Sequence, residues 1–151
     1  MNDDAQVDPA NTPAGYREVR YHFSEGLPQL LTELECSLLV STYQAGKVAV
    51  VSAAQNAINF SFHNFDQAMG LALGSNILAV GTQSQIWFLH AVRELAPQIE
   101  PVGQHDTCFI TRSAFATGNI HSHEMAWAGD ELWIVNTLFS CLCSLHSDFN
   151  T

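Results

Sequence analysis

The sequence predicts an all-β protein of antiparallel strands arranged as propeller-like blades, with one short N-terminal helix. Two observations carry this prediction. Short strand-like runs separated by turn residues fill most of the chain, and one strand pattern recurs at about 40 residues, a spacing typical of propeller blades. The 151 residues are 47% hydrophobic and 13% charged, so the chain can bury one sizeable core.

A short amphipathic helix is expected over residues 26–35. Leucines at i, i+3, i+4 and i+7 form one face, Pro28 is acceptable in the first turn, and Ser24 is the candidate N-cap. Before it, residues 16–23 alternate aromatic and charged side chains, which fits either a short outer strand or an extended arm. We expect residues 1–15 to form a disordered tail and residues 16–151 to form one partial propeller-like domain.

Three strands are expected after the helix. Residues 38–42 and 48–51 are rich in apolar and β-branched side chains, and Gly46 lies in the polar turn between them, so they form a β-hairpin. Residues 57–65 then alternate, with aromatic side chains on one face and polar side chains on the other. Together these strands make the first blade-like unit.

The first strand pattern returns twice. The three copies read Leu-Leu-Val-Ser-Thr, Leu-Ala-Val-Gly-Thr and Trp-Ile-Val-Asn-Thr, and they end at Thr42, Thr82 and Thr137. The spacing is 40 residues and then 55, and we assign the surplus to a loop-like insertion at residues 91–119, in which residues 108–111 are the one strand-like run. About 2.5–3 units fit in the chain, whereas a closed propeller has at least four blades. We therefore expect an incomplete propeller, either a fragment of a longer protein or a chain that self-associates through its open blade edges.

Composition excludes several classes of partner. Five Lys and Arg against fifteen Asp and Glu give a formal net charge of −10, which leaves no basic surface for nucleic acid. The N-terminus does not resemble a signal peptide, and no apolar run approaches the ~20 residues that span a bilayer. Four cysteines without a secretory signal indicate reduced thiols. We expect a cytoplasmic protein with no membrane partner.

Several motifs resemble a known family. They are Ser-Thr-Tyr-Gln-Ala-Gly-Lys at 41–47, Met-Gly-Leu-Ala at 69–72, Thr-Gly-Asn-Ile-His-Ser-His at 117–123, and Leu-Trp-Ile-Val-Asn-Thr-Leu-Phe-Ser-Cys-Leu at 132–142. Over residues 36–149 the chain resembles the amino-terminal part of an uncharacterised family of bacterial conserved hypothetical proteins, domains of unknown function. The resemblance implies a β-propeller-like fold with further blades after residue 149, and it implies no activity.

The densest group of titratable side chains follows the insertion and includes His121, His123 and Glu124. In a strand, the two imidazoles would project from one face and could hold a divalent metal ion, Zn²⁺ or Mn²⁺. Candidates for further ligands are His105, Asp106 and His63. A bound metal could activate water for hydrolysis. The alternative is that these histidines make structural hydrogen bonds that tie the insertion to the blade.

Lys47 and Arg112 are scarce cations in this acidic chain, and with Asn136 they are the residues expected to bind an anionic ligand. Lys47 does not belong to a phosphate-binding loop, because the G-x-x-x-x-G-K-[ST] pattern is absent, so the alternative is a hairpin turn with Lys47 in solvent. Cys141 and Cys143 are interpreted as core thiols rather than zinc ligands. The aromatic residues expected to serve packing are Trp87, Phe88, Trp127, Trp133 and Phe139.

The sequence favours a non-catalytic, propeller-like binding or scaffold module whose partner is an unknown protein or small molecule. No complete catalytic set and no certain cofactor is recognisable. The alternative is a metal-dependent hydrolase or lactonase-like enzyme that uses His121, His123 and Glu124. Because propellers host both kinds of function, the predicted fold does not decide between them.

Overall fold

The computed structural model describes residues 19–145, which are mostly β structure. The single α-helix within these residues, α1 (Leu27–Glu33), comes first. The strands are β1 (Leu38–Thr42), β2 (Lys47–Ala54), β3 (Ala57–Asn64), β4 (Leu71–Leu73), β5 (Ile77–Gly81), β6 (Gln85–Ala91), β7 (Phe109–Ala116), β8 (Ser122–Ala128), β9 (Glu131–Asn136) and β10 (Cys141–Ser144), with a 3₁₀ helix, η2 (Ala96–Gln98), between β6 and β7. The predicted tail at residues 1–15 lies outside the described residues.

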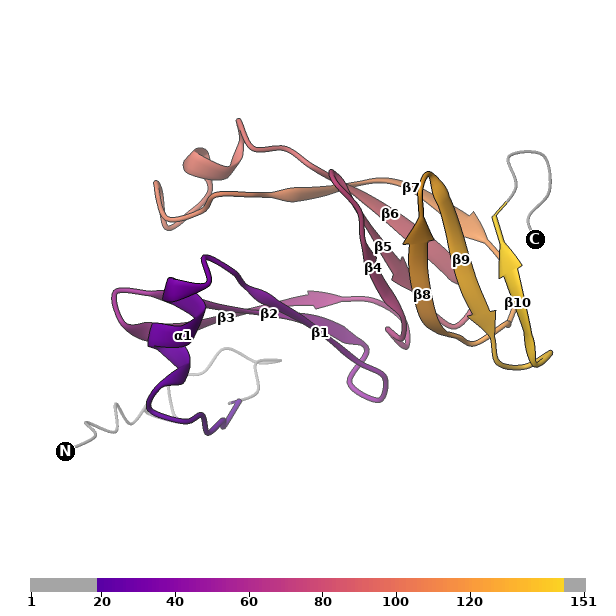
Figure 1. The fold of residues 1–151 in the computed structure, drawn as a ribbon, viewed down its shortest axis with the longest axis horizontal. Coiled ribbons are helices and arrows are strands. Elements are labelled where there is room, and N and C mark those ends of the chain that lie inside the picture. Colours follow the sequence, from indigo (N-terminus) through magenta and orange to yellow (C-terminus); the bar gives the residue numbers. More distant parts are fainter. Residues whose placement is uncertain (1–18, 146–151) are drawn as a thin grey trace, which may run out of the picture.

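The strands form three antiparallel sheets, each a meander of consecutive strands. Sheet A contains β1–β3, sheet B contains β4–β7 and sheet C contains β8–β10, and none of the three closes into a barrel. Figure 1 shows sheets A and C at opposite ends of the molecule with sheet B between them. This confirms the predicted fold class of antiparallel β units with one short N-terminal helix. No helix within residues 19–145 is long and apolar enough to cross a membrane.

The first predicted hairpin is confirmed. Thr42 pairs with Lys47 across a four-residue turn, in which Gly46 takes the positive φ of 59° that favours glycine. The predicted insertion at 91–119 is wrong in its second half, because β7 occupies residues 109–116 and pairs with β6. This strand carries polar side chains such as Thr111 and Arg112 and is mostly exposed, so it shows no buried face that the sequence could reveal.

Two hydrophobic clusters hold the three sheets together. Between sheets A and B, Val48 of β2 packs with Leu78 and Val80 of β5. Between sheets B and C, the buried cluster is Ala72, Ala79, Ile86, Ile120, Met125, Leu132 and Ile134. Strands β4 and β5 contact β8 directly, and the backbone N–H of Gly70 donates to the carbonyl oxygen of Ser122 at 2.9 Å. Sheet B therefore has both faces covered, whereas sheets A and C each use one face against it.

A polar side chain bonds to the hairpin backbone at the end of each of three equivalent strands, as a donor in sheets A and B and as an acceptor in sheet C. The hydroxyl of Thr42 donates to the Lys47 carbonyl oxygen at 3.0 Å, and that of Thr82 donates to the Gln85 carbonyl oxygen at 2.9 Å. In sheet C the corresponding residue is Asn136, whose Oδ1 accepts from the backbone N–H of Phe139 at 3.1 Å. The side chains of these residues satisfy backbone groups that the hairpin turns would otherwise leave unpaired.

The expected equivalence of Thr137 with Thr82 is therefore wrong by one residue. The burial alternation explains the error, because Leu132, Ile134 and Asn136 are the buried side chains of β9. A shift of one residue in a strand moves every side chain to the other face of the sheet. The shared Val-x-Thr pattern in the sequence therefore does not show which side chains of β9 are buried.

When the three sheets are superimposed by their equivalent hairpin turns, each outer sheet lacks one strand position. Strands β1, β5 and β9 are equivalent, and in sheets B and C they are preceded by β4 and β8. Within residues 19–145, sheet A has no strand before β1, and sheet C has no strand after β10 that would match β7. Each outer sheet thus contains three strands of a four-strand pattern, and sheet B contains all four.

Helix α1 and the segment before it cover part of sheet A. Helix α1 contacts β2 and β3. On the predicted leucine face Leu31 is buried, whereas Leu30 and Leu34 are 50% and 62% exposed. Its N-cap is Gly26 rather than the predicted Ser24. Upstream, Tyr21 lies outside regular secondary structure, and its ring packs 4.3 Å from that of Phe60. Of the two alternatives for residues 16–23, the described part, 19–23, is therefore an extended arm.

Candidate functional site

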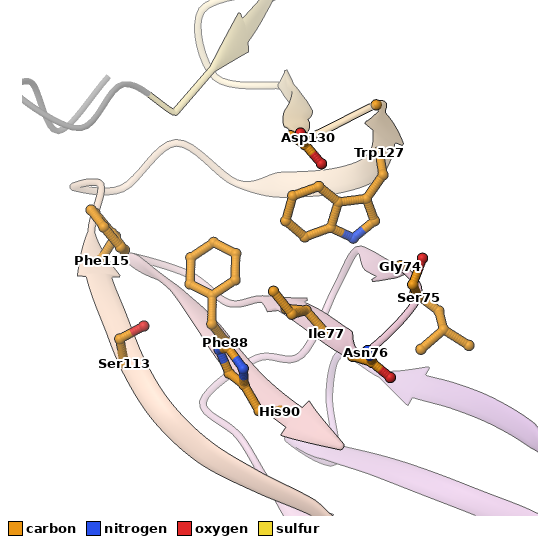
Figure 2. Close-up of a pocket in the computed structure, with 12 residues that line it drawn as sticks. Gly74, Ser75, Asn76, Ile77, Phe88, His90, Ser113, Phe115, Trp127 and Asp130 are labelled. Carbon is orange, nitrogen blue, oxygen red and sulfur yellow. The ribbon is translucent and has the colours of Figure 1, made fainter. Parts of the chain in front are cut away.

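The candidate site is a groove between sheets B and C with a volume of about 800 Å³. The two turns that join β4 to β5 and β8 to β9 form one side, and side chains of β6 and β7 form the other (Figure 2). The lining residues are Leu73, Gly74, Ser75, Asn76, Ile77, Phe88, His90, Ser113, Phe115, Trp127, Gly129 and Asp130. The groove therefore exists only where two sheets meet.

Three aromatic side chains give the groove its apolar wall. The ring of Phe88 lies edge-on to Phe115 at a centroid distance of 5.7 Å, and it lies 6.2 Å from the ring of Trp127. The indole Nε1 of Trp127 donates to the carbonyl oxygen of Ala72 at 3.1 Å, which holds the ring in place across the junction of the two sheets. The predicted packing role of Phe88 and Trp127 is confirmed, because both pack against the core between sheets B and C.

Polar side chains surround these rings. Figure 2 shows Asp130 on the β8–β9 turn next to Trp127, with Ser113 and His90 on the facing strands. Asp130 is the only carboxylate in the lining, which contains no Lys or Arg. The groove thus combines aromatic faces with one negative charge. The sequence did not reveal the groove, because Asp130, a turn residue, and Phe115, which lies after the strand-like run at 108–111, approach Phe88 only through tertiary packing.

The predicted histidine pair is brought together in part. The rings of His121 and His123 lie 6.1 Å apart, and the ring of Tyr43 from the β1–β2 turn stacks on His123 at 6.1 Å. The regular strand expected here is wrong, since His121 precedes β8 with a φ of 50° and His123 lies at a bulge where the β8–β9 register shifts. The N–H of His123 donates to the His121 carbonyl oxygen at 2.8 Å, which closes a tight turn.

The other predicted metal ligands lie apart from this pair or point to solvent. His105 is in the β6–β7 connection, and its Nε2 lies 3.2 Å from the carbonyl oxygen of Glu100. Glu124 is exposed on β8. In the described part of the chain, no group of three or more His, Cys, Asp or Glu residues is placed to hold a metal ion. The metal-dependent hydrolase hypothesis stays a prediction from the sequence, with only the pair His121 and His123 brought close.

The three residues predicted to bind an anion lie in three different sheets. Lys47 begins β2, and its ammonium group donates to Oδ1 of Asn64 on β3. Arg112 is exposed on β7 of sheet B. Asn136 is buried at the end of β9 and serves the hairpin turn described above. The structure does not gather these residues around one space, and their role in anion binding remains a prediction.

Comparison with known proteins shows one match. A family described as a domain of unknown function, DUF4915, matches residues 25–151. This chain belongs to the DUF4915 family. No curated protein and no solved structure matches it. In this DUF4915 domain, the groove and the histidine pair both lie within the matched residues.

The two thiols near the end of the DUF4915 domain have different environments. Cys143 is half-buried, and its Sγ donates to the carbonyl oxygen of Ile134 at 3.8 Å, whereas Cys141 is exposed. The core-thiol interpretation is therefore confirmed for Cys143 and wrong for Cys141. Burial, together with the neighbouring Cys141, raises the pKa of the Cys143 thiol above its usual value.

We expect this difference to appear in alkylation rates. Because the thiolate is the reactive form, Cys143 should react more slowly with iodoacetamide than Cys141 at about pH 8, and the difference should narrow as the pH rises. Mass spectrometry of timed reactions on the native DUF4915 domain measures both rates. In denaturant the two cysteines should react alike. Equal rates in the native protein would contradict the assigned environments.

Proposed function

We propose that this chain is a cytoplasmic, non-catalytic, propeller-like binding module that holds a small organic cation with an aromatic or apolar body. The observation that carries the proposal is the groove between sheets B and C, where Phe88, Phe115 and Trp127 meet the carboxylate of Asp130. Binding grooves typically combine an apolar wall with a few polar groups that orient the ligand.

The propeller-like part of the proposal is supported by the sheet arrangement. Three meanders follow one another along the chain, and each packs on the next through an apolar interface. At the same place in each sheet, Thr42, Thr82 and Asn136 each bond through the side chain to the backbone of the hairpin. Consecutive four-stranded meanders that stack face to face are the building units of propellers.

The non-catalytic part is supported by the roles of the buried polar side chains. Among the described residues these are Thr82, Thr117, Ser122 and Asn136. Thr117 donates to the carbonyl oxygen of Gly118 and Ser122 to that of Thr82, and the other two serve hairpin turns. Each of these side chains therefore has a structural hydrogen bond with the backbone.

The charge of the groove selects the class of ligand. Asp130 supplies a negative charge that no lining cation neutralises, and the formal net charge of −10 adds a favourable field for cations. The faces of Phe and Trp rings attract a cation through their quadrupole. An aromatic quaternary ammonium compound matches both features, whereas an anion of the same size does not.

Calorimetric titration with two matched probes tests this function. We expect benzyltrimethylammonium to bind the wild-type chain and phenylacetate, a similar aromatic anion, not to bind. Asp130→Asn should weaken binding of the cation by about tenfold, equivalent to about 1.4 kcal/mol. Glu131→Gln, which changes an exposed carboxylate outside the groove, is the control and should bind as wild type does. Equal binding of both probes, or unchanged binding by Asp130→Asn, would refute the proposal.

A further inference from the structure

Two imidazole rings lie next to each other where the chain enters β8. The ring centroids of His121 and His123 are 6.1 Å apart, with His121 half-buried and His123 exposed. The groove is at the other end of this strand, where Trp127, Gly129 and Asp130 line it. His121 and His123 therefore form a second cluster, separate from the groove, and we call them the histidine pair.

The ring nitrogens of the histidine pair are not used to hold the fold together. Within residues 19–145 their side chains make no hydrogen bond, and their ring contacts are with each other and with Tyr43. Two other histidines differ in this respect. Nε2 of His63 lies 3.2 Å from the hydroxyl oxygen of Ser61, and Nε2 of His105 lies 3.2 Å from a backbone carbonyl oxygen. The nitrogens of the histidine pair are therefore available to a ligand.

The residue between the two histidines holds this segment in place. Ser122 is fully buried, its hydroxyl donates to the carbonyl oxygen of Thr82 at 3.2 Å, and its own carbonyl oxygen accepts from the N–H of Gly70 at 2.9 Å. Because Ser122 points into the junction of sheets B and C, its two neighbours are carried toward the surface. The left-handed φ of His121 and the hydrogen bond from the His123 N–H to the His121 carbonyl oxygen then close the turn.

A ring from another sheet packs on the histidine pair. Tyr43, in the β1–β2 turn of sheet A, stacks on His123 with 6.1 Å between the ring centroids and 25° between the ring planes. This contact keeps the exposed His123 ring near that of His121. A site whose side chains are already positioned loses less conformational entropy when a ligand binds.

The separation of the two rings is within the reach of one metal ion. A Zn–N bond of about 2.1 Å puts the centre of each imidazole about 3.2 Å from the ion, so two rings on one ion lie at most about 6.4 Å apart, and about 5.2 Å apart at a tetrahedral angle. The observed 6.1 Å lies below this limit. A shift of the exposed His123 side chain by about 1 Å would give the tetrahedral arrangement. The formal net charge of −10 also favours a cation.

We propose that the histidine pair binds one Zn²⁺ ion through a ring nitrogen of each imidazole. Histidine nitrogen is a common ligand of four-coordinate zinc. Within residues 19–145 no third His, Cys, Asp or Glu is grouped with the pair, so water occupies the remaining positions and can be exchanged for another ligand. The zinc site depends neither on the propeller-like arrangement nor on the groove ligand proposed above.

Calorimetric titration of the full 151-residue chain with Zn²⁺ tests the proposal. The protein is prepared without a histidine tag, and bound metal is removed with EDTA before dialysis. We expect one Zn²⁺ per chain to bind at micromolar concentration, and Mg²⁺, which prefers oxygen ligands, not to bind. His121→Asn and His123→Gln should each weaken Zn²⁺ binding by about tenfold or more, because even the loss of an outer-shell partner typically costs this much. Asn accepts a left-handed φ, so His121→Asn keeps the turn.

The control is His22→Ala, which removes an exposed histidine before α1 and should bind Zn²⁺ as wild type does. Cu²⁺ binds imidazole more tightly than Zn²⁺ does and gives a second measurement. The electron paramagnetic resonance spectrum of bound Cu²⁺ should show coupling to two nitrogen nuclei in the wild type and to one in each variant of the histidine pair. Far-UV circular dichroism verifies that the variants fold.

Three outcomes would overturn the zinc site. They are a wild type that binds no Zn²⁺, folded variants of the histidine pair that bind Zn²⁺ as tightly as wild type, and a wild-type Cu²⁺ spectrum with fewer than two coupled nitrogen nuclei. The last outcome decides the question even where a variant does not fold. A chain that binds Zn²⁺ but not benzyltrimethylammonium would refute only the groove function.

Discussion

Replacing Gly81 with valine is expected to destabilise the fold by about 3 kcal/mol or more, the upper end of overpacking effects in well-packed cores. A Cβ atom at this position would lie 2.5 Å from the Ser122 hydroxyl oxygen and 2.9 Å from the Ser122 backbone oxygen. The hydroxyl could rotate, but the backbone oxygen is held by its hydrogen bond with Gly70. Sheet C would have to move away from sheet B. Urea denaturation followed by circular dichroism measures the loss.

Two further variants separate crowding from a general effect of replacing glycine. Gly26→Ala adds the Cβ where no atom lies within 4 Å, and it should change stability by less than about 1 kcal/mol. The double variant Gly81→Ala with Ser122→Ala removes the closest clash, so its loss should be smaller than the sum of the two single losses. A Gly81→Val protein as stable as wild type would show that sheets B and C do not approach at this point.

Truncating Ile86 to alanine is expected to cost about 2–5 kcal/mol, because a fully buried side chain leaves a cavity that its neighbours fill only in part. Ile86 lies in the cluster that joins sheets B and C. Leu138→Ala, at a position 57% exposed in a turn, is the matched control and should cost less than about 0.5 kcal/mol. The same urea titration compares them. Similar losses for both variants would contradict the placement of Ile86 in the core.

Local patterns in the sequence predicted most of the individual strands. The Leu-x-Val-x-Thr pattern at residues 38–42 and the alternation at residues 57–65 both correspond to strands within one or two residues. These strands have one apolar face, so the two-residue period is visible in the sequence. Strand β7 lacks this two-residue period, because it is the outer strand of sheet B and carries polar residues on both faces. Its full length becomes visible only through its pairing with β6.

Less of the candidate site than of the fold could be predicted from the sequence. The pair His121 and His123 could be selected because the two residues are close in the chain, yet the bulge and the positive φ that set their geometry were not visible in the residue types. The groove was missed altogether. Its aromatic wall joins Phe88 and Phe115 of sheet B with Trp127 of sheet C, and no short-range pattern links residues so far apart.

By itself, the sequence determined the class of the protein: antiparallel strands, a short helix and an acidic surface follow from periodicity, turn residues and charge. Only the tertiary structure decided how the three sheets are aligned and which faces stay open. Side chains alternate between the two faces of a strand, so a shift of one residue exchanges the faces. Similar residue types at Thr82 and Thr137 do not show which of two alignments, one residue apart, is correct. Packing against sheet B distinguishes them, because Ile134 is buried against sheet B whereas Trp133 and Val135 are exposed on the opposite face of sheet C.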